Sequence, residues 1–456
     1  MSALANPRVG ITYLPHQEAG VRWMIAQEAS DIRGGILGDD MGLGKTFQTI
    51  GLLKNGAPLR TLIVCPPALL SAWADELRAC GYAVAELTGA ATWSSKKSAA
   101  GSTVWLTTYP KVTIHEISIK KEAFQRIILD EGHAIRNGAA TARWLSCMAI
   151  ADAAEARWIL SATPIQNGKK DWRNLCAWLR VKGVPEADTI MLRRTMAELR
   201  GDIEALPAPP RFIQHELHIK AGTEEGKLFR SLCDYAETAM DSNSISLFDK
   251  LELWMRIQQF LVHPQIYIEA MRTKYDGGYS RPDWTADATK WSACMAELQK
   301  GVDAKVGTIV FCQFRSEIQM VCLAAAAMGA EVFSVCGGTD AGAEVEGAKK
   351  AAAEGKPVVI VVQIVSGGAG LNLQFCTRIL FLSQHWNPAV VHQAVGRAVR
   401  IGQKAVVEIH FFAIVDEVAE NLDRRMAELH GEKIEGARDV CESLFEGFHV
   451  VEDVSE

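Results

Sequence analysis

The sequence lacks the segments that would place the protein in a membrane. No apolar run reaches the ~18 residues that argue for a transmembrane helix. The longest such run, VVIVVQIV at 358–365, is typical of one buried strand. The N-terminal MSALANPRVG has no apolar core of the kind that a secretory signal peptide carries. We therefore expect neither a membrane span nor export.

Paired cysteines are also missing. The 11 cysteines are scattered, without any C-x-x-C pair. This spacing indicates neither a zinc cluster nor a disulfide framework. It favours a reducing compartment. We expect a cytoplasmic protein, or a nuclear one if the source is eukaryotic. Separately, a compact chain in which we find no zinc cluster, nuclease motif or basic tail suggests a bacterial or viral origin.

A large excess of positive charge is absent as well. The net charge is −6, which disfavours a protein that coats nucleic acid by bulk charge. A basic cleft within an acidic body remains compatible with this value. Local basic pairs, each best explained singly as solvated surface, occur at Lys96-Lys97, Lys120-Lys121, Lys169-Lys170 and Arg193-Arg194.

What the sequence does contain is a regular alternation of short apolar runs with helical patterns. The runs are continuous, as in strands that are covered on both faces. Strand-helix alternation predicts a parallel α/β sheet. In the first half the strand candidates are 35–38, 61–65, 104–108, 126–130 and 157–162, and in the second half 308–312, 331–335, 357–365, 378–383 and 407–412.

The middle of the chain differs from both halves. Residues 223–272 carry apolar side chains at the i, i+3, i+4 spacing of helices. The prolines of PAPPR, at 207–211, suggest a connector. The expected organisation is a first lobe over 1–205, a linker over 206–222, a helical insertion over 223–287 and a second lobe over 288–456.

The stretch GDDMGLGKT, residues 38–46, resembles a phosphate-binding loop. The strict pattern G-x-x-x-x-G-K-[ST] has glycine where Asp39 stands, so a plain glycine-rich turn is the alternative. The stretch lies between a strand candidate and a helical pattern, as a phosphate loop does. Gly42 and Gly44 would let backbone N–H groups face phosphate oxygens. Lys45 would reach the β- and γ-phosphates, and Thr46 would ligate Mg²⁺.

A second acidic motif supports the nucleotide site. IILDEGH places Asp130 and Glu131 at the end of a strand candidate. Asp130 could hold Mg²⁺ directly or through water, and Glu131 could act as general base on the attacking water. The alternative, a solvated acidic turn, is disfavoured by the buried strand and by the loop upstream.

In their order along the chain, these motifs resemble those of the Snf-two family of helicase-like ATPases, within helicase superfamily two. The resemblance covers about residues 11 to 415, and in this family an acidic residue at position 39 is usual. LRR (192–194), RIQQFLVHP (256–264) and HWNP (385–388) are further similarities. The matching segments are LPHQEAGVRW (Q-motif), DDMGLGKT (motif I), TLIVCPPALLSAW (Ia), LTTYP (Ib), DEGH (II), SATPIQN (III), IVFCQF (IV), SGGAGLNLQ (V) and QAVGRAVRIGQ (VI).

The resemblance implies an α/β fold of two RecA-like lobes, each a parallel sheet flanked by helices, with a helical insertion at the start of the second lobe. It implies ATP and Mg²⁺ as cofactors, with Thr46 and Asp130 at the metal and Gln17 at the adenine. The residues implied to hold the nucleotide are Gln17, Asp39, Met41, Gly42, Leu43, Gly44, Lys45, Thr46 and, from the second lobe, Gly370.

The resemblance also assigns catalytic roles outside the loop. Ser161 and Thr163 would couple hydrolysis to lobe movement. Gln393, Arg397 and Arg400 would face the γ-phosphate, where a guanidinium is typically worth ~10³–10⁵ in rate. The alternative for the two arginines is a pair on one helix face that makes surface ion pairs.

DNA contacts are implied through motifs Ia, Ib, IV and V, which in relatives track the phosphate backbone. Such contacts position a protein on the duplex without reading bases. Trp386 could instead be an ordinary core tryptophan, and Ser366 stands where relatives often have Lys or Ala. The candidates are Thr108, Lys111, Gln313, Ser366, Asn372 and Trp386.

The function expected from these residues is a DNA-stimulated ATPase that translocates on double-stranded DNA by coupling hydrolysis to lobe closure. A strand-separating or fork-remodelling helicase, acting on forked DNA, is one alternative. An ATP-driven subunit of a larger DNA-processing complex is another. A non-enzymatic binder is disfavoured because every catalytic position is filled. We expect a monomer with no membrane association.

Overall fold

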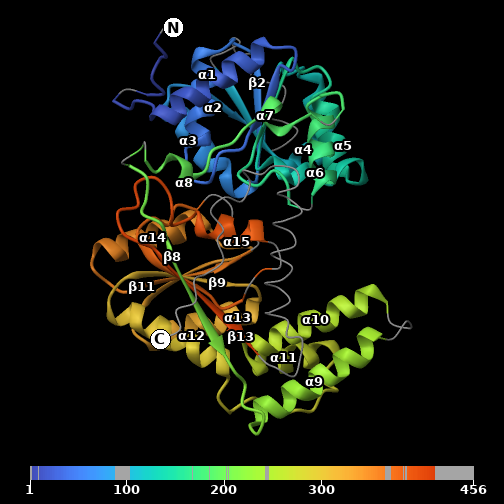
Figure 1. Ribbon diagram of the computed structural model, residues 1–456, viewed down its shortest axis with the longest axis vertical. Coiled ribbons are helices and arrows are strands. Elements are labelled where there is room, and N and C mark those ends of the chain that lie inside the picture. Colours follow the sequence, from blue (N-terminus) through green and yellow to red (C-terminus); the bar gives the residue numbers. More distant parts are fainter. Residues whose placement is uncertain are drawn as a thin grey trace. The chain divides into compact units, whose positions relative to one another are not determined.

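The computed structural model describes residues 3–415 apart from 9, 88–102, 167, 184, 202, 204, 242–245, 365–370, 384 and 386–387. Figure 1 shows the ribbon coloured along the sequence. The chain divides into two compact units, whose main boundary in the sequence lies between Leu206 and Pro207. Within the described residues, no helix combines the length and the apolar character that crossing a bilayer requires.

The first unit is built on a seven-stranded sheet in the order β3-β4-β2-β5-β6-β1-β7. Every described strand pair in it is parallel. The five expected strands are present. The two edge strands were not expected, because runs of four and two residues give too little pattern. The strands are β1 (Gly34–Leu37), β2 (Thr61–Cys65), β3 (Ala83–Glu86), β4 (Thr103–Thr108), β5 (Arg126–Asp130), β6 (Ala156–Leu160) and β7 (Met191–Leu192).

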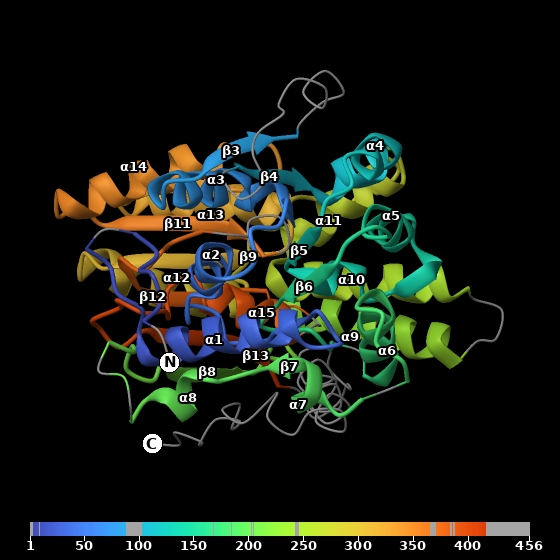
Figure 2. The same cartoon turned by 90° about the horizontal axis from the view of Figure 1, so that it is seen from above.

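Helices cover both faces of this sheet, with α1, α2 and α3 on one side and α4, α5 and α6 on the other (Figure 2). Because side chains alternate along a strand, Leu62 and Val64 enter one core and Ile63 and Cys65 the other. The helices are α1 (Pro15–Ala29), α2 (Lys45–Asn55), α3 (Leu70–Ala79), α4 (Tyr109–Lys121), α5 (Ala142–Ile150), α6 (Lys169–Trp178), α7 (Ala187–Ile190) and α8 (Met196–Leu199).

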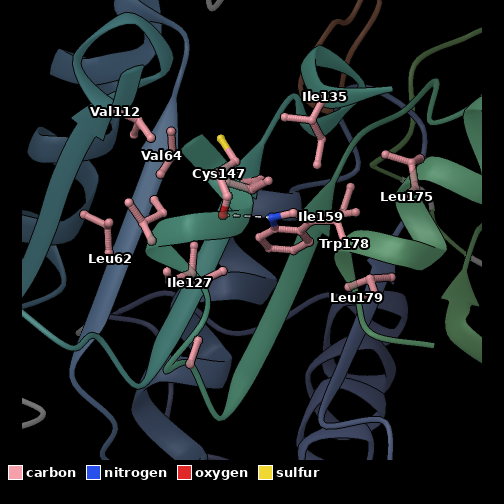
Figure 3. Close-up of a cluster of buried hydrophobic side chains, with 14 of the residues drawn as sticks. Leu62, Val64, Val112, Ile127, Ile135, Cys147, Ile159, Leu175, Trp178 and Leu179 are labelled. Atoms are coloured by element: carbon pink, nitrogen blue, oxygen red, sulfur yellow. Dashed lines mark hydrogen bonds between the residues drawn. The ribbon is translucent and has the colours of Figure 1, made fainter. Parts of the chain in front are cut away.

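The core between the sheet and α4–α6 is drawn in Figure 3. Trp178 is fully buried there, among aliphatic side chains of the strands and of α6. Its indole N–H donates to the carbonyl of Cys147, at 3.1 Å. The bond satisfies the one polar atom of a side chain that otherwise contributes apolar area. This packing fixes α5 and α6 against the sheet. The loops that follow β1 and β5 of the same sheet carry the candidate site.

The second unit is built on a six-stranded sheet in the order β10-β11-β9-β12-β13-β8. All described pairs are again parallel. The prediction of two parallel sheets flanked by helices is therefore confirmed. The strands are β8 (Arg211–Leu217), β9 (Gly307–Cys312), β10 (Glu331–Val335), β11 (Val358–Gln363), β12 (Cys376–Phe381) and β13 (Glu408–Ile414).

Strand β8 lies inside the range 206–222, where we expected a linker. It pairs with β13 along its whole length, from Arg211 opposite Glu408 to Leu217 opposite Ile414. Phe212 also stacks on Phe411, with ring centroids 6.4 Å apart. As an edge strand it is only half-buried. Its mixed composition and the prolines before it therefore resembled a connector.

Helices α9, α10 and α11 occupy the range 223–272, and none of its described residues joins a sheet. They form a core around Phe229, Phe260 and Tyr267, which also includes Ile414 at the end of β13. Helices α12 and α13 pack on the sheet itself. The helices are α9 (Glu224–Asp241), α10 (Leu247–Val262), α11 (Pro264–Lys274), α12 (Thr289–Asp303), α13 (Arg315–Ala327), α14 (Ala341–Ala353) and α15 (Pro388–Val395).

Candidate functional site

The candidate phosphate loop connects β1 to α2 in the first unit. Gly42 and Gly44 both have φ of +85°, and Gly44 is the N-cap of α2. A Cβ on Gly44 would lie 2.4 Å from Nε2 of Gln17. Both the left-handed backbone and the lack of space therefore require glycine there. The loop ends at a helix N-terminus, where backbone N–H groups attract anions.

Lys45, the first residue of α2, points back into this loop. Its Nζ donates to the carbonyl oxygens of Asp39, at 2.6 Å, and Asp40, at 3.3 Å. Burial lowers the pKa of Lys45, whereas the charges of Glu131, Asp39 and Asp130 oppose that shift. An ammonium group is thus held among carboxylates at the place where the sequence predicts phosphate binding.

Asp130 ends β5 and is held in place through both carboxylate oxygens. The indole N–H of Trp73 donates to Oδ2 at 2.7 Å, and the backbone N–H of Glu131 donates to Oδ1 at 3.0 Å. The hydroxyl of Tyr109 donates to the Asp130 carbonyl, at 2.7 Å. Burial, followed by the charge of Glu131, raises the pKa of Asp130 to about 6. The carboxylate is therefore oriented and poorly solvated.

Glu131 has a left-handed backbone, with φ of +50°, a conformation that non-glycine residues adopt mainly where surrounding structure imposes it. Its Oε2 lies 3.4 Å from Nδ1 of His133. The same nitrogen is 3.1 Å from Oγ of Ser161. Oγ of Ser161 in turn accepts the backbone N–H of Thr163, at 3.2 Å. The acidic motif and the SAT motif are thereby joined through His133.

The donor set fits Mg²⁺, because this ion prefers hard oxygen ligands. Asp130 offers carboxylate oxygens at the end of β5, and Thr46 offers a hydroxyl in the first turn of α2. The lysine and the N-terminus of α2 fit a polyphosphate. The first unit thus has the groups that MgATP would require.

The other expected nucleotide contacts lie in different surroundings. The Gln17 carboxamide donates to the carbonyl of Leu43, at 3.2 Å, and accepts the N–H of Leu14, at 3.1 Å. It therefore ties α1 to the loop, and its contact with adenine stays a prediction. Met41 and Leu43 are buried, and their contact with a nucleotide stays a prediction. Gly370 lies outside the described residues.

Gln393 lies on α15, but Arg397 and Arg400 follow the end of that helix at Val395. Gln393 and Arg397 belong to the second unit, and Arg400 is grouped with the first. The alternative in which the two arginines share a helix face is therefore wrong. Arg397 is buried, with 3% of its surface exposed. Nε2 of Gln403 donates to the carbonyls of Gln374, Cys376 and Ala398 and so holds this turn.

The expected DNA contacts are dispersed over both units. Thr108 is buried at the end of β4, and Lys111 is half-buried in the first turn of α4. Gln313, half-buried after β9, lies 3.5 Å from the Gln258 amide. Asn372 is exposed. Ser366 and Trp386 lie outside the described residues.

One group of side chains in the described chain could hold a different metal. His215, Glu297 and His410 present ligand atoms within 4.8 Å of one another. The two imidazoles lie 3.0 Å apart, from Nε2 to Nδ1. However, the Glu297 carboxylate already accepts from Lys300 and Arg378. The two cationic neighbours disfavour a divalent ion there, and we read the group as a polar network.

Sequence reasoning missed the residues that support the acidic motif. Trp73 lies within the segment resembling motif Ia, but an indole in a helix gives no sign of its acceptor. His133 belongs to DEGH, and its bond to Ser161 requires β5 and β6 to be neighbours. The Arg193-Arg194 pair, expected at the solvated surface, has side chains only 5% and 14% exposed, because both face the loop between β1 and α2.

Comparison with known proteins agrees with this geometry. Residues 16–205 match the model of the SNF2-related domain, and residues 289–402 match that of the helicase conserved C-terminal domain. Together the two matches cover more than half of the chain, in the order that its motifs predict. The chain belongs to the SNF2-related helicase-like ATPases. The suspected family is thereby confirmed, and so is an ATP-hydrolysing enzyme.

Several SNF2-related relatives align over most of this chain. The "Probable global transactivator" of Orgyia pseudotsugata multicapsid polyhedrosis virus is 26% identical, covering 89% of this chain and 86% of the viral protein. The "Probable ATP-dependent DNA helicase CHR12" of Arabidopsis thaliana is 24% identical, covering 91% of this chain. The chain spans only 41% of that plant protein and 39% of a similar yeast chromatin-remodelling ATPase, ISW1.

Among solved structures, the "Sulfolobus solfataricus SWI2/SNF2 ATPase core in complex with dsDNA" is similar to this SNF2-related chain. It is 22% identical, and the match covers 96% of this chain and 99% of the archaeal one, with a TM-score of 0.42.

Proposed function

We propose that this protein is a DNA-stimulated ATPase that translocates on double-stranded DNA. The observation that carries the proposal is the meeting of Lys45, Asp130 and Glu131 at one edge of the first sheet. The loop after β1 brings the lysine, and the end of β5 brings both carboxylates. Burial is the main cause that lowers the pKa of Lys45 and raises that of Asp130, and the opposite charges of the lysine and the carboxylates counteract both shifts.

Each residue has a distinct task in this proposal. Lys45 exchanges the carbonyls of Asp39 and Asp40 for β- and γ-phosphate oxygens. Asp130 and Thr46 hold Mg²⁺, which when bound neutralises phosphate charge. Glu131 accepts the proton of the attacking water as general base. Its strained backbone and His133 aim the carboxylate.

Groups of both units take part in turnover under this proposal. Gln393, Arg397 and Arg400 act on the γ-phosphate, and the arginines stabilise transition-state charge. His133 and Ser161 transmit the state of the catalytic carboxylate to Thr163, because they already form one hydrogen-bonded series. ATP binding closes the units and hydrolysis releases them, so that DNA affinity differs between the two states.

The proposal that the protein acts on DNA is supported by its family and by the names of its relatives, which include a probable ATP-dependent DNA helicase. A net charge of −6 means that duplex affinity comes from a limited groove. Lys111, Gln313 and Asn372 are the accessible candidates. Ammonium and amide groups suit phosphates and carry no base information.

The decisive measurement is the ATPase rate of the full chain with no DNA, single-stranded DNA, duplex, forked DNA and RNA. We expect duplex to stimulate most, and two duplexes of equal length and unrelated sequence to act alike. A triplex-displacement assay then reports movement, and a strand-displacement assay reports unwinding. Stimulation by RNA alone, or no stimulation by duplex, would contradict the proposal. Unwinding of a fork would favour the helicase alternative.

A further inference from the structure

The two arginines that follow β7 run alongside the phosphate loop. Parallel pairing between β1 and β7 continues beyond both strands: the N–H of Gly38 donates to the carbonyl of Leu192 at 2.7 Å, and the N–H of Asp40 donates to the carbonyl of Arg194 at 3.0 Å. Gly38 and Asp40 of the loop are therefore bound to this segment by their main chain. The side chains of the segment add further contacts.

Arg194 holds the loop against α1 and α2. Its Nε and Nη2 donate to the two carboxylate oxygens of Asp39, at 2.9 and 2.5 Å. Nη2 also donates to Oε1 of Gln48 on α2, at 2.9 Å, and Nη1 donates to the carbonyl of His16 on α1. Asp39 has no exposed surface, and a second donor, Nε2 of Gln48, reaches it at 2.9 Å.

Arg193 holds the loop against the end of β6. Its Nη1 donates to the carbonyls of Gly38 and of Ala162, each at 2.9 Å. Its Nη2 lies 3.3 Å from Oδ1 of Asp40. The other oxygen of Asp40 accepts the N–H of Met196, at 3.1 Å. One guanidinium thus joins the phosphate loop to the SAT motif.

We propose that Arg193 and Arg194 are positioning residues of the phosphate-binding loop, which hold Gly38, Asp39 and Asp40 in place independently of Lys45. This inference rests on the proposed nucleotide site. The carbonyls of Asp39 and Asp40 are those that Lys45 contacts. When Lys45 turns towards phosphate, these two carbonyls lose their contact with its ammonium group. The two arginines then keep residues 38–40 from moving with the lysine side chain.

The arginines could instead serve the general stability of the first unit, and the two roles differ in what an Arg→Lys exchange does. A lysine at 194 keeps a positive charge beside Asp39 but loses the fork that binds Asp39, Gln48 and His16 together. The first unit as a whole can then lose some stability, but the loss of fixed geometry should be larger over residues 38–44 than in the rest of the unit.

The test compares Arg194→Lys with the wild-type chain by hydrogen exchange without nucleotide, and by titration with ADP and Mg²⁺. Arg60→Lys is the matched control, because Arg60 is a half-buried ion-pair partner of Glu122 beside β2. We expect peptides covering 38–44 to exchange at least tenfold faster in Arg194→Lys, and ADP affinity to fall at least tenfold. In Arg60→Lys both should stay within twofold of wild type.

Arg193→Lys provides a second test, in which we expect the same faster exchange over 38–44 and the same loss of ADP affinity. Wild-type exchange over 38–44 in both loop variants would overturn the inference. An increase in exchange that is as large throughout the first unit as over 38–44 would also overturn it, since that indicates a general stabilising role. So would wild-type ADP affinity in a variant whose loop exchanges faster. If wild-type ATPase is not stimulated by DNA, the proposed function fails, but the exchange result still decides the role of the arginines.

Discussion

Gly20 in α1 gives the sharpest test of how tightly the surroundings of the phosphate loop are packed. A Cβ at this position would lie 1.8 Å from Oε1 of Gln48 and 2.9 Å from Nη2 of Arg194. Real Cβ atoms do not approach other atoms so closely, so Gly20→Ala must displace the Gln48 side chain. That side chain is fully buried and bonds both Asp39 and Arg194.

The expected effect is the sum of two opposing contributions to the free energy of unfolding. Glycine to alanine in a helix interior normally stabilises by about 1 kcal/mol. Displacing Gln48 breaks two hydrogen bonds to charged groups, each worth about 1.5–3 kcal/mol. We therefore expect Gly20→Ala to lower the free energy of unfolding by about 2–5 kcal/mol.

Urea denaturation of the full chain measures this change, and Gly342→Ala is its control. Gly342 lies in the first turn of α14, where a Cβ would meet only Oδ1 of Asp340, at 3.4 Å. The control should be neutral or stabilised by up to about 1 kcal/mol. If Gly20→Ala were as stable as its control, Gln48 would have room to move and our account of this packing would be wrong.

Three further predictions address catalysis, DNA and pH. Glu131→Gln should lower the ATPase rate by ~10²–10⁴ while ADP still binds; near-wild-type turnover would remove Glu131 as the base. Lys111→Ala should weaken binding to two unrelated duplexes equally and make the slope of log K against log salt shallower by about 0.9; a loss on one duplex alone would contradict backbone tracking. Burial lowers the pKa of His410 to about 4, against roughly 6.5 when unfolded. The unfolded chain therefore binds the proton more readily, and urea denaturation should show stability that is full above pH 6.5 and falls towards pH 4; an equal fall in His410→Gln would exclude this histidine as the cause.

The sequence predicted the sheets well where strands are buried on both faces. TLIVC and RIILD coincide with β2 and β5, because a strand that is covered by helices on both faces carries apolar side chains almost continuously. Strand β8 escaped notice because its RFIQHEL is half-exposed and mixes polar with apolar residues. An edge strand is recognised by the partner it pairs with, and that partner, β13, lies far away in the sequence.

The candidate site divides in the same way. Lys45, Asp130 and Glu131 could be named from the sequence because each occupies a fixed position in a local motif. The bond from Trp73 to Asp130 could not, since it joins α3 to the end of β5 through the fold. The Arg193-Arg194 pair shows the opposite error. Two adjacent arginines in a sequence are typical of the solvated surface. However, the buried carboxylate of Asp39 needs a cationic partner, and Arg194 supplies it.

The pairing of β8 with β13 also sets the order in which the chain can fold during synthesis. Strands β1 to β7 all lie before Leu206, so the first unit has every strand described for its sheet once that residue has left the ribosome. The second sheet receives β8 first. The one strand that pairs with β8 among the described residues, β13, follows almost two hundred residues later. Such a non-local contact is slow to form. Until Ile414 emerges, β8 has no partner strand, and it is then an unpaired edge that other chains could join.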